Sequence, residues 1–107
     1  MSDNRWTIMI KSMRLASERS LRATAKELNI SEPYLRDVEK GNRPPTKRLV
    51  SSIINLYMLD DDAKRILFDA AAEANDSLPY DVEDFLKSNP NAIQAVRDMM
   101  DEKQQKK

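Results

Sequence analysis

A chain of 107 residues with no histidine and no cysteine lacks the most versatile general base, the thiolate nucleophile and the best soft metal ligands. We therefore expect no enzyme, no metal site and no cofactor. The formal net charge of zero conceals an asymmetry, because residues 1–50 hold 11 Lys and Arg against 6 Asp and Glu, whereas residues 51–107 hold 7 against 12. The basic first half is the better candidate for binding a polyanionic partner.

The residue pattern predicts an all-α protein. Apolar residues recur at spacings of three and four, the chain holds a single glycine, and no segment shows convincing strand alternation. No apolar run approaches the roughly 20 residues that a membrane span requires, so we expect a cytoplasmic protein with no membrane partner. The first predicted helix runs from about Asn4 to Ser17, with Trp6, Ile10 and Met13 facing the core.

Residues 20–41 predict two short helices joined by a tight turn. Ser20 is a good N-cap for the first of them, and Asn29 tolerates the left-handed backbone that turns the chain at its end. The apolar residues that share the inner face of this helix are Leu21, Ala25 and Leu28. Ile30 follows at the corner and is expected to fill it.

The second short helix, from about Ser31 to Lys40, is predicted to have a buried back and a polar front. Pro33 lies in its first turn, where the missing N–H costs nothing, and Gly41 follows where a helix C-terminus commonly needs positive φ. The residues predicted to face inward are Tyr34, Leu35 and Val38. The outer face carries Glu32, Pro33, Arg36, Asp37 and Lys40. Such a helix, held across another by a tight corner, has the geometry that enters a DNA major groove.

A family resemblance rests on Ser20, Ala25, Leu28, Ile30-Ser31, Tyr34-Leu35 and the string VEKGNRPP at residues 38–45, and it extends from Ile10 to about Leu59. The segment resembles the helix-turn-helix of the XRE family of bacterial regulators, relatives of the lambdoid phage repressors and Cro proteins. Two positions depart from the family pattern. Thr24 stands where the family usually has Leu, which implies a thinner core, and Leu21 stands where many members place a Gln that contacts phosphate.

The resemblance implies a sequence-specific transcriptional regulator, expected to be a repressor, that binds double-stranded DNA as a homodimer. Together with the predicted helices, it implies a five-helix phage-repressor-like domain over residues 1–76. Two additional helices would follow over residues 77–107. The alternative is an antitoxin or accessory factor that has a protein partner and uses the helix-turn-helix as a scaffold.

Base contacts are expected from the outer face of the second short helix. Arginine reads guanine through O6 and N7, and a carboxylate can accept a hydrogen bond from cytosine N4, so Arg36 beside Glu32 is the expected reading pair. The alternative is an intrahelical pair of the two that faces solvent. The full set of expected base contacts is Glu32, Pro33, Arg36 and Asp37. The expected contacts to the DNA backbone are Ser20, Arg22, Tyr34, Lys40, Asn42, Arg43 and Lys47.

The second short helix, from about Ser31 to Lys40, would be the recognition helix of the family. The resemblance also implies an ion pair between Arg14 on the first helix and Glu39 near the end of this recognition helix. A buried pair would fix the angle between the two helices. The alternative is two ordinary surface charges, worth about 0–1 kcal/mol.

A fourth helix is predicted from the N-cap Thr46 to about Leu59, and a fifth ends at about Ala74. The apolar residues expected on the fourth are Leu49, Val50, Ile53, Ile54 and Tyr57. Of the three aspartates at 60–62, one is expected to cap the fifth helix while the others favour its positive end, without any metal. The residues suited to close packing on the fifth helix are Ile66, Leu67, Ala70, Ala71 and Ala74.

Residues 77–107 form a candidate dimerisation element. Pro79 is expected to start a helix through about Lys87, and a last helix from Asn91 should end in a frayed Gln/Lys run. The apolar residues expected at a two-fold interface are Phe85, Leu86, Val96, Met99 and Met100. The alternative is that this segment folds back on its own chain and completes one larger core.

Overall fold

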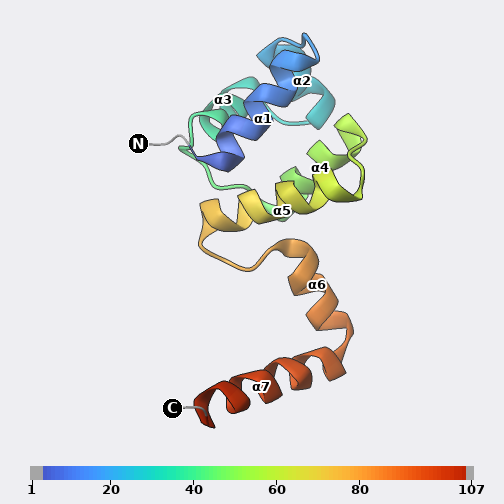
Figure 1. The fold of residues 1–107 in the computed structure, drawn as a ribbon. Helices are drawn as coiled ribbons and strands as arrows, with labels where there is room; N and C mark the ends of the chain where they lie inside the picture. The colour runs from blue at the N-terminus through green and yellow to red at the C-terminus, as the bar shows by residue number, and fades with distance from the viewer. Residues whose placement is uncertain (1–3, 106–107) are drawn as a thin grey trace. The chain divides into compact units, whose positions relative to one another are not determined.

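The computed structural model describes residues 4–105, and over this range the chain is all-α, which confirms the predicted fold class (Figure 1). The helices are α1 (Arg5–Ala16), α2 (Leu21–Leu28), α3 (Glu32–Glu39), α4 (Lys47–Tyr57), α5 (Asp61–Asn75), α6 (Tyr80–Ser88) and α7 (Pro90–Gln105). They fall into two compact units, an N-terminal unit that ends at Ser77 and a C-terminal unit that begins at Leu78. None of the helices over residues 4–105 is long and apolar enough to cross a bilayer.

Each of the first five helices begins at a side chain that accepts a hydrogen bond from the helix's first turn. Asn4 and Thr7 form a reciprocal capping box on α1. The remaining caps, with the donor nitrogen and its distance, are Ser20 for α2 (Ala23, 3.0 Å), Ser31 for α3 (Tyr34, 3.2 Å), Thr46 for α4 (Leu49, 3.1 Å) and Asp60 for α5 (Ala63, 2.8 Å). Each cap satisfies a backbone N–H that has no partner within the helix. The predicted N-caps are therefore confirmed, and no acidic cluster that could hold a metal ion occurs in the described part of the chain.

The corner between α2 and α3 is made by Asn29, whose φ of 59° and ψ of 44° place it in the left-handed region as predicted. The next amide, Ile30 N–H, donates to the Ala25 carbonyl at 3.0 Å and closes the end of α2. Gly41, just after α3, has a φ of 82°, which confirms the positive φ predicted at this helix end. Met58 and Asp76 end α4 and α5 in the same left-handed conformation, at φ values of 48° and 52°.

The core of the N-terminal unit is formed by all five of its helices. α1 packs on α3 and α5, α2 packs on α3 and α4, and α4 packs on α5. The largest buried apolar side chains are Trp6, Ile10, Leu28, Leu35, Val38, Leu49, Val50, Ile53 and Leu67. Met13, Tyr34, Ile54 and Tyr57, expected on the same faces, are only half-buried.

One core expectation for α5 is wrong. Ile66 is 48% exposed, whereas Leu67, Ala70 and Ala71 are at most 1% exposed and Ala72 is also buried. Consecutive helical residues point about 100° apart, so a helix that turns Leu67 fully inward carries Ile66 to the edge of the interface. Alanines on the inner face let α5 approach its neighbours closely.

The C-terminal unit consists of α6 and α7, which pack on each other. No residue between 80 and 104 is buried. The last helix starts at Pro90 rather than Asn91, because proline suits the first helical position. It continues through Gln105, whereas Lys106 and Lys107 lie outside the described residues, so fraying of the terminal Gln/Lys run stays a prediction.

Candidate nucleic-acid interface

α3 has one face fixed in the core and the other in solvent. Leu35 and Val38 are 2% and 0% exposed and anchor the helix against α1 and α2. Pro33 and Arg36 are exposed on the outside, and Glu32 and Asp37 are half-buried beside them. The four residues expected to read bases thus lie on a single short helix whose orientation is set by its buried side chains.

Arg36 pairs with Glu32 in the free protein. Its Nη2 donates to Glu32 Oε2 at 2.7 Å, and the side chains are 45% and 37% exposed. The exposed intrahelical pair, one of the two alternatives left open by the sequence, is therefore present, and it is worth about 0.3–0.5 kcal/mol. A guanidinium has five N–H donors, so this contact leaves donors free for a further partner.

The loop after α3 is held against that helix. Asn42 N–H donates to the Asp37 carbonyl at 2.9 Å. Arg43 Cζ lies 5.9 Å from the centre of the Tyr34 ring, and Arg43 Nε lies 4.0 Å from Asp37 Oδ2. These contacts place the exposed Arg43 beside α3, and the exposed Lys47 follows at the start of α4.

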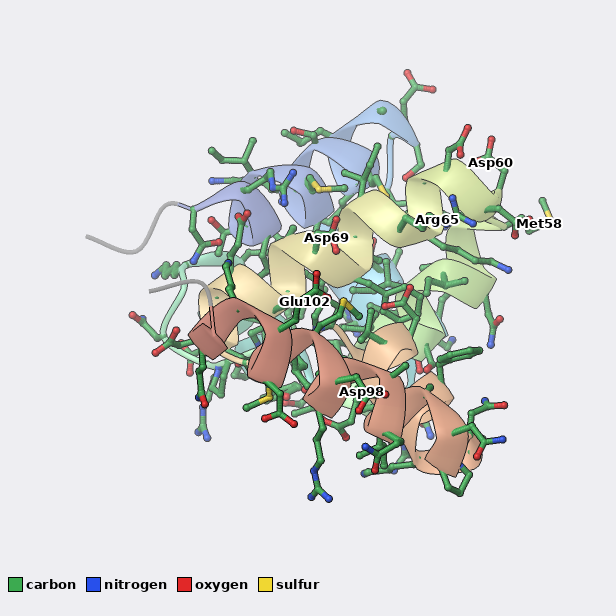
Figure 2. All side chains as sticks on the ribbon, turned by 60° about the horizontal axis from the view of Figure 1, so that its bottom comes forward. Met58, Asp60, Arg65, Asp69, Asp98 and Glu102 are labelled. Atoms are coloured by element: carbon green, nitrogen blue, oxygen red, sulfur yellow. The ribbon has the colours of Figure 1, made fainter. Side chains whose placement is uncertain are left out.

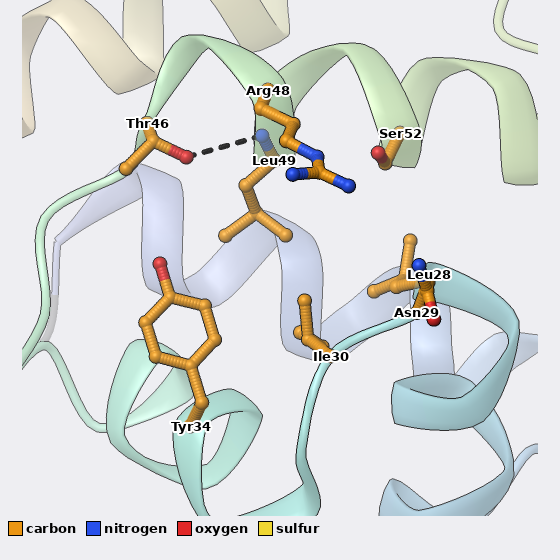
Figure 3. A pocket seen from close by; sticks show the side chains of 8 residues that line it. All are labelled: Leu28, Asn29, Ile30, Tyr34, Thr46, Arg48, Leu49 and Ser52. Carbon is orange, nitrogen blue, oxygen red and sulfur yellow. Dashed lines mark hydrogen bonds between the residues drawn. The ribbon is translucent and has the colours of Figure 1, made fainter.

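A cavity of about 230 Å³ lies between the α2–α3 corner and α4 (Figure 3). Its residues are Leu28, Asn29, Ile30, Tyr34, Thr46, Arg48, Leu49 and Ser52. In Figure 3 the Tyr34 ring stands opposite the start of α4, where Thr46 accepts its capping hydrogen bond from Leu49 N–H. Tyr34, a residue of α3, thus lies across the cavity from the N-terminus of α4, which carries partial positive charge.

The remaining predicted backbone contacts lie at two ends of the motif. Ser20 and Arg22 are exposed at the start of α2, where the Ser20 hydroxyl already serves as the cap. Lys40 and Asn42 are exposed at the end of α3. These four residues therefore lie at two places, the start of α2 and the end of α3.

Arg14 and Glu39 form a bidentate ion pair between α1 and α3. Arg14 Nε donates to Glu39 Oε2 at 2.7 Å and Nη2 donates to Oε1 at 2.9 Å, while the side chains are only 13% and 6% exposed. Arg14 Nη1 also donates to the Arg19 carbonyl at 3.3 Å. The hydrogen bonds that Arg14 donates to Glu39 raise the pKa of the Arg14 guanidinium above its ordinary value, although burial opposes the shift. This pair ties α3 to α1.

The residues expected at a dimer interface are accessible in the C-terminal unit. Phe85 and Met99 are each 60% exposed, Met100 is 54% exposed and Val96 is 40% exposed. Leu86 is half-buried. Val82 and Ile93 are also exposed.

Sequence reasoning missed Lys11. This residue lines a second hollow of the N-terminal unit together with Arg14, Leu21, Arg36, Glu39 and Lys40. The sequence feature that could have identified Lys11 is its spacing of three residues from Arg14, which puts both side chains on one face of α1. Its proximity to α3 could be found only from the packing of α1 on that helix.

Two capped helices joined through a left-handed corner, with the second anchored on one face and polar on the other, define a helix-turn-helix. Consistent with this geometry, a family model described as a helix-turn-helix domain matches residues 9–67, and the chain belongs to this family. The matched range contains every residue expected to contact DNA. Comparison with curated proteins and with solved structures gave no significant match.

Proposed function

We propose that this protein is a sequence-specific DNA-binding transcriptional repressor of the XRE type that places α3 in the major groove. The observation that carries the proposal is the two-sided character of α3. Its inner side is locked by Leu35, Val38 and the Glu39–Arg14 pair, and its outer side presents Arg36 and Glu32 to solvent. A helix held this firmly can present side chains to base edges in one register.

Arg36 is the proposed base-reading residue. Its guanidinium can bond guanine O6 and N7, and Glu32 either orients it or accepts from cytosine N4 on a neighbouring pair. Pro33 and Asp37 complete the proposed base-facing surface. Pro33 has no side-chain hydrogen bond to offer, so it would act through apolar contact, for example with a thymine methyl group.

Contacts to the DNA backbone are proposed from residues at the start of α2, on α3 and after its end. Arg43 and Lys47 follow α3, and the capped start of α4 adds partial positive charge beside them. The remaining members of the proposed set are Ser20, Arg22, Tyr34, Lys40 and Asn42. These contacts set register and carry no sequence information by themselves.

We further propose that the functional species is a homodimer assembled through the C-terminal unit. A lone helix-turn-helix reads a half-site, and tight binding normally uses two copies about one DNA turn, roughly 34 Å, apart. The C-terminal unit spans only Leu78–Lys107 and contains no cysteine, and folds below about 40 residues usually need a disulfide, a metal or a partner chain. A second copy would cover Phe85, Met99 and Met100.

The test is selection of duplexes from a random pool, followed by titration of wild type and Arg36→Ala on the selected duplex and on a scrambled one. Arg36→Ala should cost about 1–3 kcal/mol on the selected duplex and relax preference at one base pair. The matched control is Arg65→Ala, which removes an exposed arginine from α5, outside α2 and α3 (Figure 2).

Two outcomes would contradict the proposal. Equal losses on the selected and scrambled duplexes would remove Arg36 from base readout. Failure to enrich any duplex would reject sequence-specific binding and favour the alternative function, in which the helix-turn-helix serves as a scaffold for a protein partner.

A further inference from the structure

The hollow that contains Lys11 is a cleft between three helices. α1 contributes Lys11 and Arg14, α2 contributes Leu21, and α3 contributes Arg36, Glu39 and Lys40. We call these six residues the cationic cleft. Its volume is about 270 Å³, and it lies where α1 and α2 both pack on α3.

Four cations and one carboxylate line this cleft. The carboxylate, Glu39, is already bonded through both oxygens to Arg14, and Arg36 is paired with Glu32 outside the cleft. Lys11 and Lys40 are exposed and form no ion pair within residues 4–105. The positive charge that remains uncompensated in the cleft therefore belongs to these two lysines.

The remaining lining residue is Leu21, which offers no hydrogen-bonding side chain. An anion entering the cleft would therefore be bound through charge, and lysine suits a phosphate group as a flexible point charge. A bidentate fork is not available from Arg14, because its Nε and Nη2 already bond Glu39.

Arg36 belongs to the cleft and also to the outer face of α3. An anion bound in the cleft would consequently lie directly beside the surface proposed to face base edges. The anionic groups that flank a major groove are the backbone phosphates of DNA. The charge and the position of the cleft thus favour the same ligand.

We propose that the cationic cleft binds a backbone phosphate of the DNA, with Lys11 and Lys40 as its ligands. This inference rests on the proposed DNA-binding function and adds a contact made by α1, outside the two helices of the motif. Together with Arg43 and Lys47, which follow α3 in the chain, the cleft would help to hold α3 in the groove.

The test compares wild type with Lys11→Gln on duplexes obtained by the selection experiment. Lys11→Gln should lower the magnitude of the slope of log K against log salt by about 0.9 per protomer, which corresponds to roughly a five-fold loss of affinity per half-site at 0.15 M salt. Arg65→Gln is the matched control, because it removes one exposed positive charge on α5 and should leave the salt slope unchanged. Thermal unfolding of both variants should match wild type, because both side chains are exposed.

The phosphate itself can be located with duplexes that carry one neutral methylphosphonate at a time. At one position per half-site, the methylphosphonate should weaken wild type more than Lys11→Gln, because the variant has already lost one of the two lysine contacts to that phosphate. Additive losses at every position, or an unchanged salt slope, would overturn the cleft assignment. Wild-type binding with a steep salt slope would still support the proposed function, so the two failures are distinguishable.

A free anion is the other source of the same chemistry. Inorganic phosphate, added at constant ionic strength, should not shift the amide resonances of residues 11, 21 and 40 at millimolar concentration. Saturable shifts, combined with unchanged DNA binding by Lys11→Gln, would assign the cleft to a free phosphate and overturn the DNA contact.

Discussion

The two units of this chain show the same secondary structure with opposite burial. In the N-terminal unit Trp6 and Leu67 are 1% and 0% exposed, whereas in the C-terminal unit Phe85 and Met99 are each 60% exposed. The first unit fixes its helices by an internal core, and the second has amphipathic helices without one. Helical order without burial is marginal in water, so we propose that the second unit packs against a further surface. The comparison separates the part that would bind DNA from the part that would assemble copies.

The largest expected effect comes from removing the second unit. A chain truncated after Ser77 should remain folded, because the packing of the first unit lies within residues 4–77. It should sediment as a monomer and bind the selected two-half-site duplex roughly a thousand-fold more weakly, through loss of the second binding event. Full-length protein should sediment as a dimer at micromolar concentration. A full-length monomer at high micromolar concentration would reject the assembly role of the C-terminal unit.

Two substitutions to alanine test the difference in burial between the two units. Leu67→Ala removes a fully buried side chain and should lower the free energy of unfolding by about 3 kcal/mol, as measured by urea denaturation. Phe85→Ala removes an exposed side chain of greater size. In the full-length variant, the unfolding transition of the N-terminal unit should therefore be unchanged. The effect of this substitution should instead appear as weaker dimerisation in sedimentation. A large loss of stability from Phe85→Ala in the N-terminal transition would indicate that the side chain packs on its own chain.

The Arg14–Glu39 pair provides a smaller test within the first unit. Glu39→Gln leaves a largely buried guanidinium without its counter-charge and should cost about 2 kcal/mol of stability, less than the full cost of breaking a completely buried pair. A loss below about 0.5 kcal/mol would mean that the pair behaves as an exposed one. Because its pKa is raised, Arg14 contributes stability that is fully present below the unfolded-state pKa and is lost only as pH rises through the higher folded-state value. The difference between wild type and variant should therefore be constant from neutral into mildly alkaline pH.

The smallest expected effect is a gain in the stability of the N-terminal unit. Met58 is 87% exposed and ends α4 at a φ of 48°, and Figure 2 shows its side chain projecting from the corner that leads into α5. Met58→Gly should raise the midpoint of thermal unfolding by an amount equivalent to about 0.5 kcal/mol, since relief of left-handed strain exceeds the extra entropy of the unfolded chain. Asn29→Gly, at a similar φ, should gain less because asparagine tolerates this region. Neither change should alter dimerisation, and a loss of stability in Met58→Gly would contradict the strain argument.

The sequence predicted those features of the fold that depend on neighbouring residues. The caps at Ser20, Ser31 and Thr46 and the corner at Asn29 follow from local hydrogen bonding and backbone preference, which act over three or four residues. The orientation of Ile66 could not be predicted, because consecutive apolar residues give no information on which one faces the neighbouring helix.

The candidate site was predictable to a similar extent. The outer face of α3 follows from helical periodicity, but the placement of Lys11 in the same hollow as Lys40 depends on how α1 packs on α3. In the free protein, the guanidinium of Arg36 can either bond Glu32 or remain in solvent, and in a complex DNA would compete for it. Sequence spacing alone does not decide which partner it takes. The contacts to DNA stay predictions until a duplex is bound.

The charges on the outer face of α3 neutralise one another locally, through Arg36 with Glu32 and through the weaker approach of Arg43 to Asp37. If α3 enters the groove, this arrangement bears on how the protein searches a genome. Random sequence would meet a face with little net charge, and the two acids would repel its phosphates. The outer face of α3 would therefore add little to retention on the very large excess of non-cognate sites, while the cognate sequence could recruit Arg36 into specific bonds. Local neutrality at the reading surface would thus shorten non-productive encounters and increase the fraction of copies free to occupy the operator.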